Sequence, residues 1–236
     1  MSEPEQILAY ISANFFLTRP LEGKKAIVTA GPTYESIDPV RFIGNHSSGK
    51  MGIAIARELY HRGAEVTLIM GPSPVDIAAN GVALVRVQTA DEMYKISSEA
   101  FSTTDIAVMA AAVADYTPVS KAAEKIKKKE DKLVIELTKT KDILKSLGEK
   151  KKEGQVLVGF ALETNNEEAY AMEKLRSKHA DMIVLNSLND PGAGFGHDTN
   201  KITIFEKGGR SFGFETKPKD QVAKDIVDTI IRLYYA

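Results

Sequence analysis

The chain has 236 residues, of which 43% are hydrophobic and 27% charged, and its formal net charge of -1 favours neither nucleic acid nor an anionic membrane as a partner. It has no cysteine, which excludes disulfides, thiolate nucleophiles and cysteine-ligated metals, and its four histidines lack the spacing of a zinc site. No apolar run approaches the roughly 18 residues that span a bilayer, and no signal pattern opens the chain, so we expect a cytoplasmic protein without a membrane partner.

The first predicted elements surround a loop rich in glycine. Residues 1–20 look helical and are interpreted as a tail, a linker or a packing arm, so that residues 21–236 form a single domain. A short β-strand is predicted over residues 25–29, and apolar residues recur at helical spacing over residues 51–61, before Gly63. The loop between them therefore leads into a helix N-terminus, where unpaired backbone amides and the helix dipole attract anions.

The composition of this loop suits a bound phosphate or carboxylate. Gly49 and Gly52 would let a ligand approach the backbone closely, and Ser47 and Ser48 could donate to an anion. Capping of the helix by these serines is the simpler alternative. A cap does not require so many glycines or Asn45, so we favour a ligand-binding loop.

Two common nucleotide motifs do not fit this loop. Gly44 to Lys50 matches the start of a P-loop, but Met51 stands where a P-loop has the hydroxyl that binds Mg²⁺, and residues 31–43 separate the loop from its strand. A dinucleotide fingerprint is absent after the first strand, and the glycines of residues 192–196 have neither its spacing nor a preceding strand turn. The anion site is therefore expected to be of another kind.

Strands and helices alternate along the rest of the chain. Strands are predicted over residues 65–70, 83–87, 105–112, 156–160 and 182–185, helices over residues 90–101 and 166–179, a hairpin over residues 202–205 and 212–215, and a closing helix over residues 220–235. This order predicts an α/β fold that is Rossmann-like, with a mostly parallel, doubly wound sheet and a small β-hairpin.

The predicted topology also places a ligand. Ligands of parallel α/β sheets bind at the carboxyl ends of the strands. Residues 29–31, 110–115, 160–164 and Asn186 all follow strand ends, so these four separate stretches should converge on one crevice.

Residues 121–152 carry twelve lysines against six acidic residues. Those beyond Lys145 are interpreted as a solvated face. Lys125, Lys127 and Lys128 differ, because they follow a strand-end loop and precede a β-like stretch over residues 133–137. We interpret them as a lysine-rich flap beside the crevice that neutralises a polyphosphate. Nucleic acid is not expected, because no aromatic residues interleave with the lysines.

The order and spacing of six motifs resemble the phosphopantothenoylcysteine synthetase family, also called phosphopantothenate-cysteine ligase, of the bacterial CTP-dependent type. The motifs are Thr-Ala-Gly-Pro-Thr (29–33), Ile-Asp-Pro-Val-Arg-Phe-Ile (37–43), Asn-His-Ser-Ser-Gly-Lys-Met-Gly (45–52), Ala-Ala-Val-Ala-Asp-Tyr (111–116), Lys-Ile-Lys-Lys (125–128) and Val-Gly-Phe-Ala-Leu-Glu-Thr (158–164).

The resemblance implies a ligase of coenzyme A biosynthesis. Such an enzyme activates 4'-phosphopantothenate with CTP as an acyl-cytidylate, releases pyrophosphate, and joins the acyl group to cysteine with release of CMP. CTP is then a co-substrate, Mg²⁺ is carried with CTP, and a homodimer is expected. Most bacterial relatives also carry a flavin-dependent decarboxylase domain before this one, which the sequence lacks, so no flavin is expected in this chain.

The resemblance also implies roles for individual residues. Asn45 and Lys125 are the expected catalytic residues, with Asn45 bonded to the activated acyl group and Lys125 on the flap. Asn45 and Asn186 are expected at the acyl substrate, and no residue is expected to bind a metal by itself. The expected nucleotide-binding residues are Gly31, Ser47, Gly49, Gly52, Ala110, Ala111, Asp115, Lys125, Lys141, Asp142, Ile143, Leu144, Phe160, Lys174 and Lys178.

Some alternatives stay open. Phe160 could belong only to the core, and Lys174 and Lys178, at i and i+4 of one helix, could be simple surface charges. At the level of function, the fold class also hosts nicotinamide-dependent oxidoreductases and non-catalytic nucleotide sensors. The missing glycine fingerprint weakens the interpretation as an oxidoreductase. A non-catalytic sensor would not explain the pair of Asn45 and Lys125.

Overall fold

The computed structural model describes residues 19–75, 81–127, 132–163, 165–187 and 197–235. Its main sheet has eight strands in the order β12-β11-β10-β9-β6-β1-β4-β5. The six strands from β10 to β5 are parallel, and β11 and β12 continue the sheet antiparallel. The strands are β1 (Lys25–Ala30), β4 (Glu65–Met70), β5 (Ala83–Arg86), β6 (Ile106–Met109), β9 (Val156–Glu163), β10 (Met182–Ser187), β11 (Thr199–Glu206) and β12 (Ser211–Pro218).

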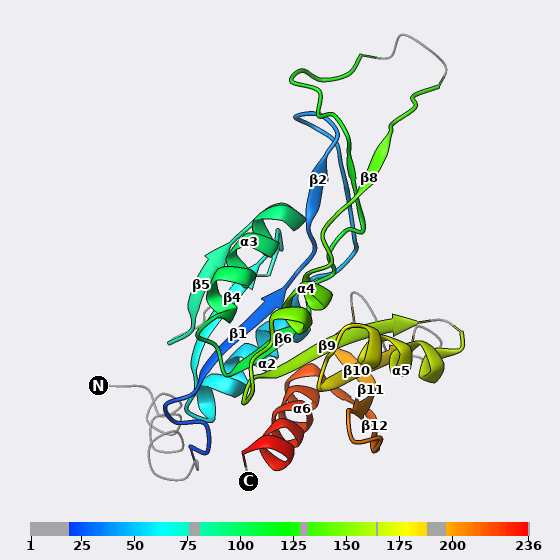
Figure 1. The fold of residues 1–236 in the computed structure, drawn as a ribbon. Coiled ribbons are helices and arrows are strands. Elements are labelled where there is room, and N and C mark those ends of the chain that lie inside the picture. Colours follow the sequence, from blue (N-terminus) through cyan, green and yellow to red (C-terminus); the bar gives the residue numbers. More distant parts are fainter. Residues whose placement is uncertain (1–18, 76–80, 128–131, 164, 188–196, 236) are drawn as a thin grey trace.

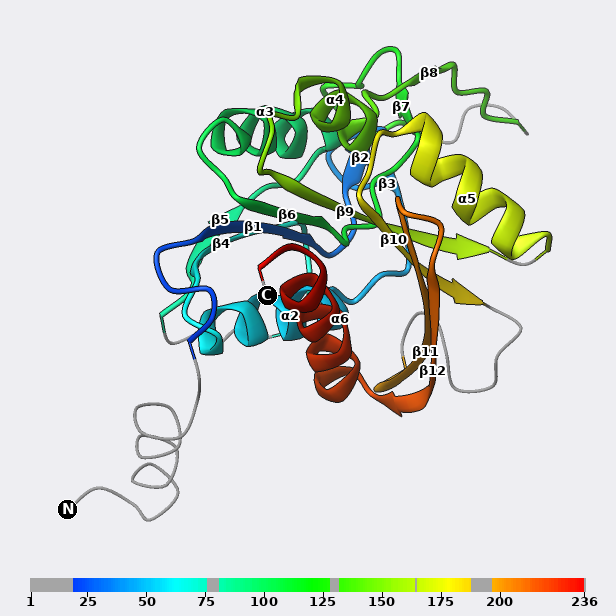
Figure 2. The same cartoon turned by 60° about the horizontal axis from the view of Figure 1, so that its bottom comes forward.

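Helices cover both faces of this sheet (Figure 2). One face carries α2 (Lys50–His61) and α6 (Lys219–Tyr234), and the other carries α3 (Ala90–Phe101), α4 (Ile143–Lys150) and α5 (Glu167–Ser177). Alternate residues of the central strands enter the two cores, so that Val28 faces α2 and α6 while Ile27 faces the other three helices. Because both faces are buried, β6 is an unbroken apolar run. The predicted α/β fold with a mostly parallel, doubly wound sheet is confirmed.

Most predicted elements occur with small changes in length. The predicted hairpin is the β11–β12 pair, which is longer than expected and forms one edge of the main sheet. The strand predicted over residues 105–112 is shorter, because beyond Met109 the chain leaves the sheet and bonds to the end of β1. There Ala111 N donates to Thr29 Oγ1 at 3.2 Å, and Ala112 N donates to Gly31 O at 2.9 Å. Helix α4 was not predicted.

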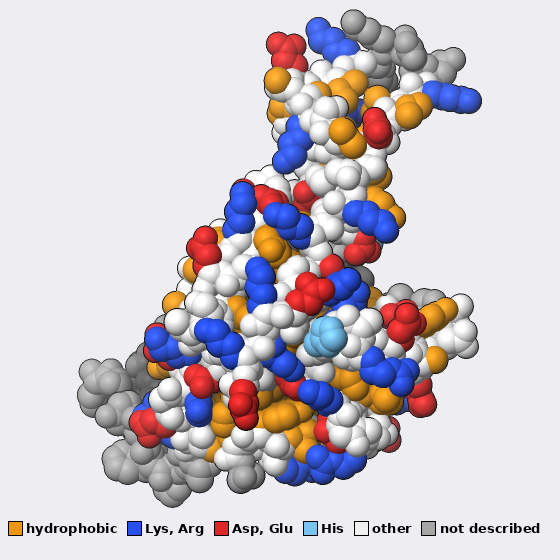
Figure 3. All heavy atoms as spheres, viewed as in Figure 1, with side chains coloured by type: hydrophobic (Ala, Val, Ile, Leu, Met, Phe, Trp, Pro, Cys, Tyr) orange, Lys and Arg blue, Asp and Glu red, His pale blue; other side chains and the backbone are white. Residues whose placement is uncertain are grey.

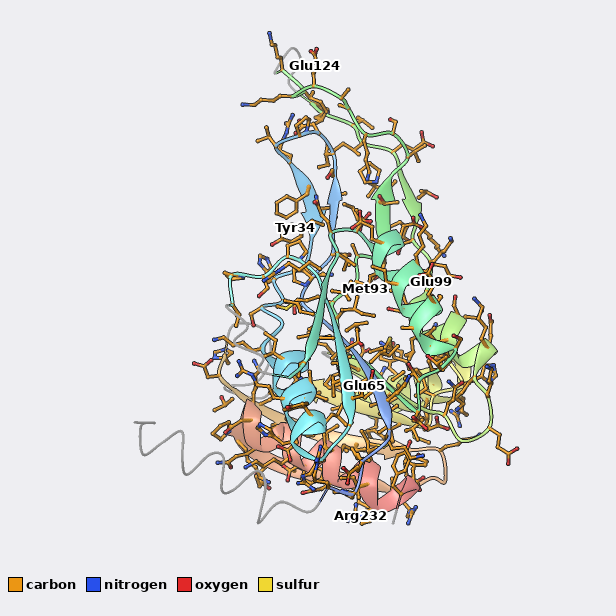
Figure 4. All side chains as sticks on the ribbon, turned by 90° about the vertical axis from the view of Figure 1, so that its left-hand side faces the viewer. Tyr34, Glu65, Met93, Glu99, Glu124 and Arg232 are labelled. Carbon is orange, nitrogen blue, oxygen red and sulfur yellow. The ribbon has the colours of Figure 1, made fainter. Side chains whose placement is uncertain are left out.

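Two small hairpins project from the sheet as an arm, which we define as residues 34–44, 116–127 and 132–139 (Figure 1). One is β2 (Tyr34–Ser36) with β3 (Phe42–Gly44), and the other is β7 (Tyr116–Pro118) with β8 (Leu137–Lys139). Of the stretch predicted as β-like over residues 133–137, only Leu137 lies in a strand. Figure 4 shows Glu124 near the tip of the arm, far beyond Tyr34.

Some predictions fall outside the described residues. These are the helical character of residues 1–18, the glycines of residues 192–196, residue 164 and Lys128. In the described part of the chain, no helix is long and apolar enough to cross a membrane.

Candidate active site

The loop predicted to bind an anion does lead into a helix. Helix α2 begins at Lys50 after Gly49, which has a left-handed backbone (φ 78°), and no side chain caps it among the described residues. Ser47 Oγ makes only a long contact with Gly49 N, at 3.4 Å. The capping alternative is therefore not realised, and the first turn of α2 keeps its amides for a ligand.

The glycines of this loop are required first by packing against the end of β1. A Cβ on Gly49 would lie 3.1 Å from Gly31 N, and a Cβ on Gly52 would lie 2.6 Å from the Cβ of Ala30. Contacts this short would push the helix away from the strand. Gly31, itself left-handed (φ 76°), lies behind the loop and lines neither of the cavities described below.

A cavity of about 360 Å³ opens beside this loop on the α2 side of the sheet, and we call it the α2 cavity. Asn45 lies at its wall and donates through Nδ2 to Ala112 O at 3.0 Å. The expected site residues that line it come from the loop, from α5 and from three of the four predicted strand-end stretches: Asn45, Ser47, Gly49, Gly52, Ala110, Ala111, Asp115, Phe160, Lys174 and Asn186.

A second cavity of about 730 Å³ lies on the α4 and α5 side, and we call it the α5 cavity. It is lined by five further expected nucleotide residues, Lys141, Asp142, Ile143, Leu144 and Lys178, together with Ala111, Asp115, Phe160 and Lys174. The last four also line the α2 cavity. The two cavities therefore adjoin around the carboxyl edge of the sheet, and the single predicted crevice is divided between its two faces.

Lys178 is not a simple surface charge. Its Nζ lies 2.8 Å from Asp142 Oδ2, and Asp142 Oδ1 accepts from Lys145 N at 2.9 Å to cap α4. Burial would raise the pKa of Asp142, but the Lys178 and Lys145 bonds outweigh it and hold that pKa below its ordinary value.

Lys174 is a half-buried cation at the wall that the two cavities share. It lines both cavities, and burial lowers its pKa from the ordinary 10.5, although Glu163 and Asp142 act to raise it. A partly desolvated ammonium of this kind is stabilised by any negative charge placed beside it.

The flap lysines lie elsewhere. Lys125 and Lys127 are on the arm and line neither cavity, and the cations near the arm tip are visible in Figure 3. The arm is tied together by Asp38, whose Oδ2 accepts from Ile126 N at 3.1 Å and from Arg41 Nε at 2.9 Å. The structure does not bring Lys125 together with Asn45 within one chain, so the catalytic role of Lys125 stays a prediction.

Sequence reasoning missed several lining residues. Met51 and Glu163 stand inside motifs that were recognised, so proximity to expected site residues could have indicated them. Asn200 and Lys219 stand in no motif and reach the α2 cavity only through the fold. The α5 cavity adds Tyr116, the last residue of a recognised motif. It also adds residues that carry no local signal: Lys139, Thr140, Tyr170, Glu173 and Ser177.

A mostly parallel α/β sheet, a glycine-bounded helix start and cavities at the carboxyl edge define a protein of the Rossmann-like class with a candidate ligand site at that edge. The chain belongs to the family of the DNA/pantothenate metabolism flavoprotein C-terminal domain, whose model matches residues 21–234. The resemblance drawn from the six motifs is confirmed at this level.

Individual relatives agree with this assignment. The coenzyme A biosynthesis bifunctional protein CoaBC of Bacillus subtilis is 44% identical over 99% of this chain, which spans 58% of that protein. A protein of an unknown prokaryotic organism, named cysteine/cysteine sulfinic acid decarboxylase, is 48% identical over 100% of this chain and 67% of its own length. The chain thus spans between about half and two thirds of the curated relatives it matches.

Two solved structures show which known domains this chain resembles. The crystal structure of the C-terminal domain of CoaBC has a TM-score of 0.78 and 41% identity, and covers 92% of this chain and 98% of that domain. A Cab2 mutant solved in complex with phosphopantothenate-cysteine has a TM-score of 0.69 at 16% identity over 97% of this chain and 92% of its own, which supports the fold alone.

Proposed function

We propose that this chain is a CTP-dependent phosphopantothenate-cysteine ligase of coenzyme A biosynthesis. One observation carries the proposal: residues chosen from motifs spread between positions 45 and 186 line two adjoining cavities at one edge of the sheet. Membership of the family, and the match to the C-terminal domain of CoaBC, support it.

The residues divide the work between the two cavities. The α5 cavity, with Lys141 to Leu144, Lys174 and Lys178, would hold the nucleotide. The start of α2 would hold phosphate oxygens through its amides. Asn45, fixed by its bond to Ala112 O, would hold the acyl oxygens of phosphopantothenate beside them. A carboxylate placed next to the α-phosphate then needs charge neutralisation more than a protein nucleophile.

Mg²⁺ bound to CTP would supply part of that neutralisation. Asp115 and Glu163 line the wall that the two cavities share, and their carboxylates would face such an ion. This fits Mg²⁺, which prefers oxygen ligands. Within the described ranges no group of three or more potential metal ligands occurs.

The proposal includes three further features. Residues 21–236 are taken as one synthetase domain preceded by a tail or linker, and the protein is placed in the cytoplasm. The protein is also proposed to be a homodimer in which the arm of one copy closes the site of the other. This last feature would reconcile the expected role of Lys125 with its distance from the cavities of its own chain. Exposed apolar residues on the arm, Val40, Phe42, Tyr116, Val119, Leu133, Val134 and Leu137, support such an association.

The test is a half-reaction assay. Pyrophosphate should appear from CTP only when phosphopantothenate is present, and CMP release coupled to amide formation should follow the addition of cysteine. ATP is run in parallel, and much slower turnover with ATP is expected. Hydrolysis of CTP without phosphopantothenate would contradict the proposal, and so would release of CO₂ from cysteine or cysteine sulfinate as the only reaction.

A further inference from the structure

Two residues that line the α2 cavity have a buried amide oxygen without a hydrogen-bond partner. These oxygens are Asn186 Oδ1 and Asn200 Oδ1. Asn200 is only 1% exposed. Proteins keep few buried acceptors unpaired, because such a group loses its water without compensation. Two of them at the wall of one cavity point to a ligand that brings hydrogen-bond donors.

Their position in the sheet is unusual for polar side chains. On β10, Met182, Val184 and Asn186 alternate toward the α2 and α6 face, and the first two belong to the core. On β11, Ile204, Ile202 and Asn200 do the same. Extending the β10–β11 pairing by one residue brings Asn186 opposite Ile202, two residues from Asn200. On each strand, therefore, the inward-facing position next to the cavity is an asparagine, whereas the inward-facing positions before it are apolar core residues.

The contact with Met51 fixes which atom of Asn200 is left unpaired. Asn200 Nδ2 lies 3.9 Å from Met51 Sδ on α2, and Met51 also lines the cavity. A thioether sulfur accepts hydrogen bonds and cannot donate them. The amide nitrogen therefore faces the sulfur, and the oxygen remains as the unpaired acceptor.

We propose that Asn200, together with Asn186, is a specificity-determining acceptor pair for the acyl substrate. This inference rests on the proposed function and deepens it. Ionised phosphates and carboxylates carry no donor, so neither the triphosphate nor the carboxylate of phosphopantothenate can satisfy these oxygens. The amine of cysteine does carry donors, and the comparison of KM values below distinguishes it from phosphopantothenate. The middle of phosphopantothenate offers one hydroxyl and one amide N–H, two donors for two acceptors. Asn45 at the same cavity wall would hold its carboxylate end.

The experiment compares KM values for the three substrates in Asn200→Leu, which has nearly the same shape but no acceptor. We expect KM for phosphopantothenate to rise about tenfold or more, because a site built to bond a donor is impaired when it loses its acceptor. KM for CTP and for cysteine should stay within about twofold. A rise in KM for CTP or cysteine instead would overturn the assignment, as would three unchanged values.

Substrate analogues identify the bond. Phosphopantothenate without the hydroxyl, or with its amide N-methylated, should bind the wild-type protein about tenfold more weakly. One of the two losses should vanish in Asn200→Leu, because the partner is already gone. If both analogues lose as much affinity in Asn200→Leu as in the wild-type protein, Asn200 bonds to neither group and the proposal is refuted. Direct calorimetry with the analogues gives the same comparison in Asn200→Val if the leucine variant does not fold.

A matched control separates binding from stability. Ser97 on α3 also has a buried oxygen without a partner, but it lines neither cavity. Asn200→Leu and Ser97→Ala should both leave the free protein as stable or more stable, since each removes an unpaired polar atom. Only Asn200→Leu should lose the thermal stabilisation that phosphopantothenate gives. If the wild-type protein forms no pyrophosphate, the proposed function fails; if it does and Asn200→Leu behaves like Ser97→Ala, only this inference fails.

Discussion

At the scale of single residues, the glycines around α2 combine two requirements that can be separated. Gly49 needs both a left-handed backbone and the space beside Gly31, whereas Gly154 has a similar φ of 83° and nothing within 4 Å of the position that a Cβ would take. Gly154→Ala should cost about 1 kcal/mol of unfolding free energy from backbone strain alone. Gly49→Ala should cost about 1–3 kcal/mol more from overpacking.

Urea unfolding of both variants measures this difference. Gly49→Ala should also weaken CTP binding, because the start of α2 moves, whereas Gly154→Ala should bind CTP like the wild-type protein. Equal stability losses in the two variants would show that the close approach to Gly31 has no energetic consequence.

The half-buried charge of Lys174 predicts a pH dependence of CTP binding. Burial lowers the pKa of Lys174 in the free protein, and a bound triphosphate would favour the protonated form and raise that pKa. CTP affinity should therefore be constant below the free pKa and fall as the pH rises between the free and the bound pKa, starting below the ordinary value of 10.5.

Calorimetric titration of CTP against pH tests this prediction. Lys174→Gln should weaken binding about tenfold at neutral pH and flatten the alkaline part of the profile. Lys145→Gln is the control, since Lys145 is an exposed residue of α4 that lines neither cavity. An unchanged profile in Lys174→Gln would show that this lysine does not meet the phosphates.

At the scale of elements, the sequence predicts best what burial dictates. The apolar runs of β6 and β9 and the helical spacing of α3 follow from cores on both faces, and these elements lie where they were expected. The arm was missed because its strands have three residues each and lie outside the main sheet, so neither length nor alternation distinguishes them from loops. Asn200 was missed for a related reason, since a polar residue at the end of a strand carries no local sign of burial.

The arm depends on one carboxylate. Oδ1 of Asp38 accepts from the backbone amides of Val40 and Arg41, both at 2.8 Å, and Oδ2 accepts from Ile126 N and the Arg41 side chain. In Asp38→Asn, Oδ1 can keep the turn, but an amide nitrogen replaces Oδ2 and meets only donors. The Ile126 amide should therefore lose its hydrogen-exchange protection at least about tenfold while the Val40 amide keeps it.

The hydrogen bonds of Asp38 also predict how the arm responds to acid. The Arg41 guanidinium, with the amides of Val40, Arg41 and Ile126, holds the pKa of Asp38 well below its usual range. Because the pKa of Asp38 is lower in the folded protein than in the unfolded chain, its ionised form stabilises the arm fully above the unfolded pKa near 4. That stabilisation is lost only as the pH falls through the folded pKa. Exchange at Ile126 should thus stay slow at pH 4 in the wild-type protein. Loss of protection already at pH 5 would contradict this electrostatic account.

At the scale of the whole molecule, the rule that ligands bind at the carboxyl edge predicted which separate stretches of the chain come together. Ala110, Asp115, Phe160 and Asn186 do meet there, although they come from three strands. The division into two cavities was not foreseeable, because it depends on α4 and α5 covering one face while the α2 loop opens on the other. The placement of Lys125 was not foreseeable either. The sequence of this segment is equally compatible with a flap beside the crevice and with an arm that reaches away from it.

The placement of Lys125 makes the proposed homodimer testable through complementation. If the arm of one copy serves the site of the other, Asn45→Asp and Lys125→Gln are each nearly inactive alone, but a mixed dimer contains one site with both native residues. Mixing the two variants in equal amounts, with exchange of subunits, should then restore roughly a quarter of the wild-type rate, since half of the dimers are mixed and each has one intact site. The measurement is pyrophosphate release from CTP and phosphopantothenate. Val134→Glu, which places a charge on the most exposed apolar residue of the arm, should weaken association and abolish the recovery. No recovery from stable, mixed dimers would mean that Lys125 acts within its own chain, after a bend of the arm, or not at all.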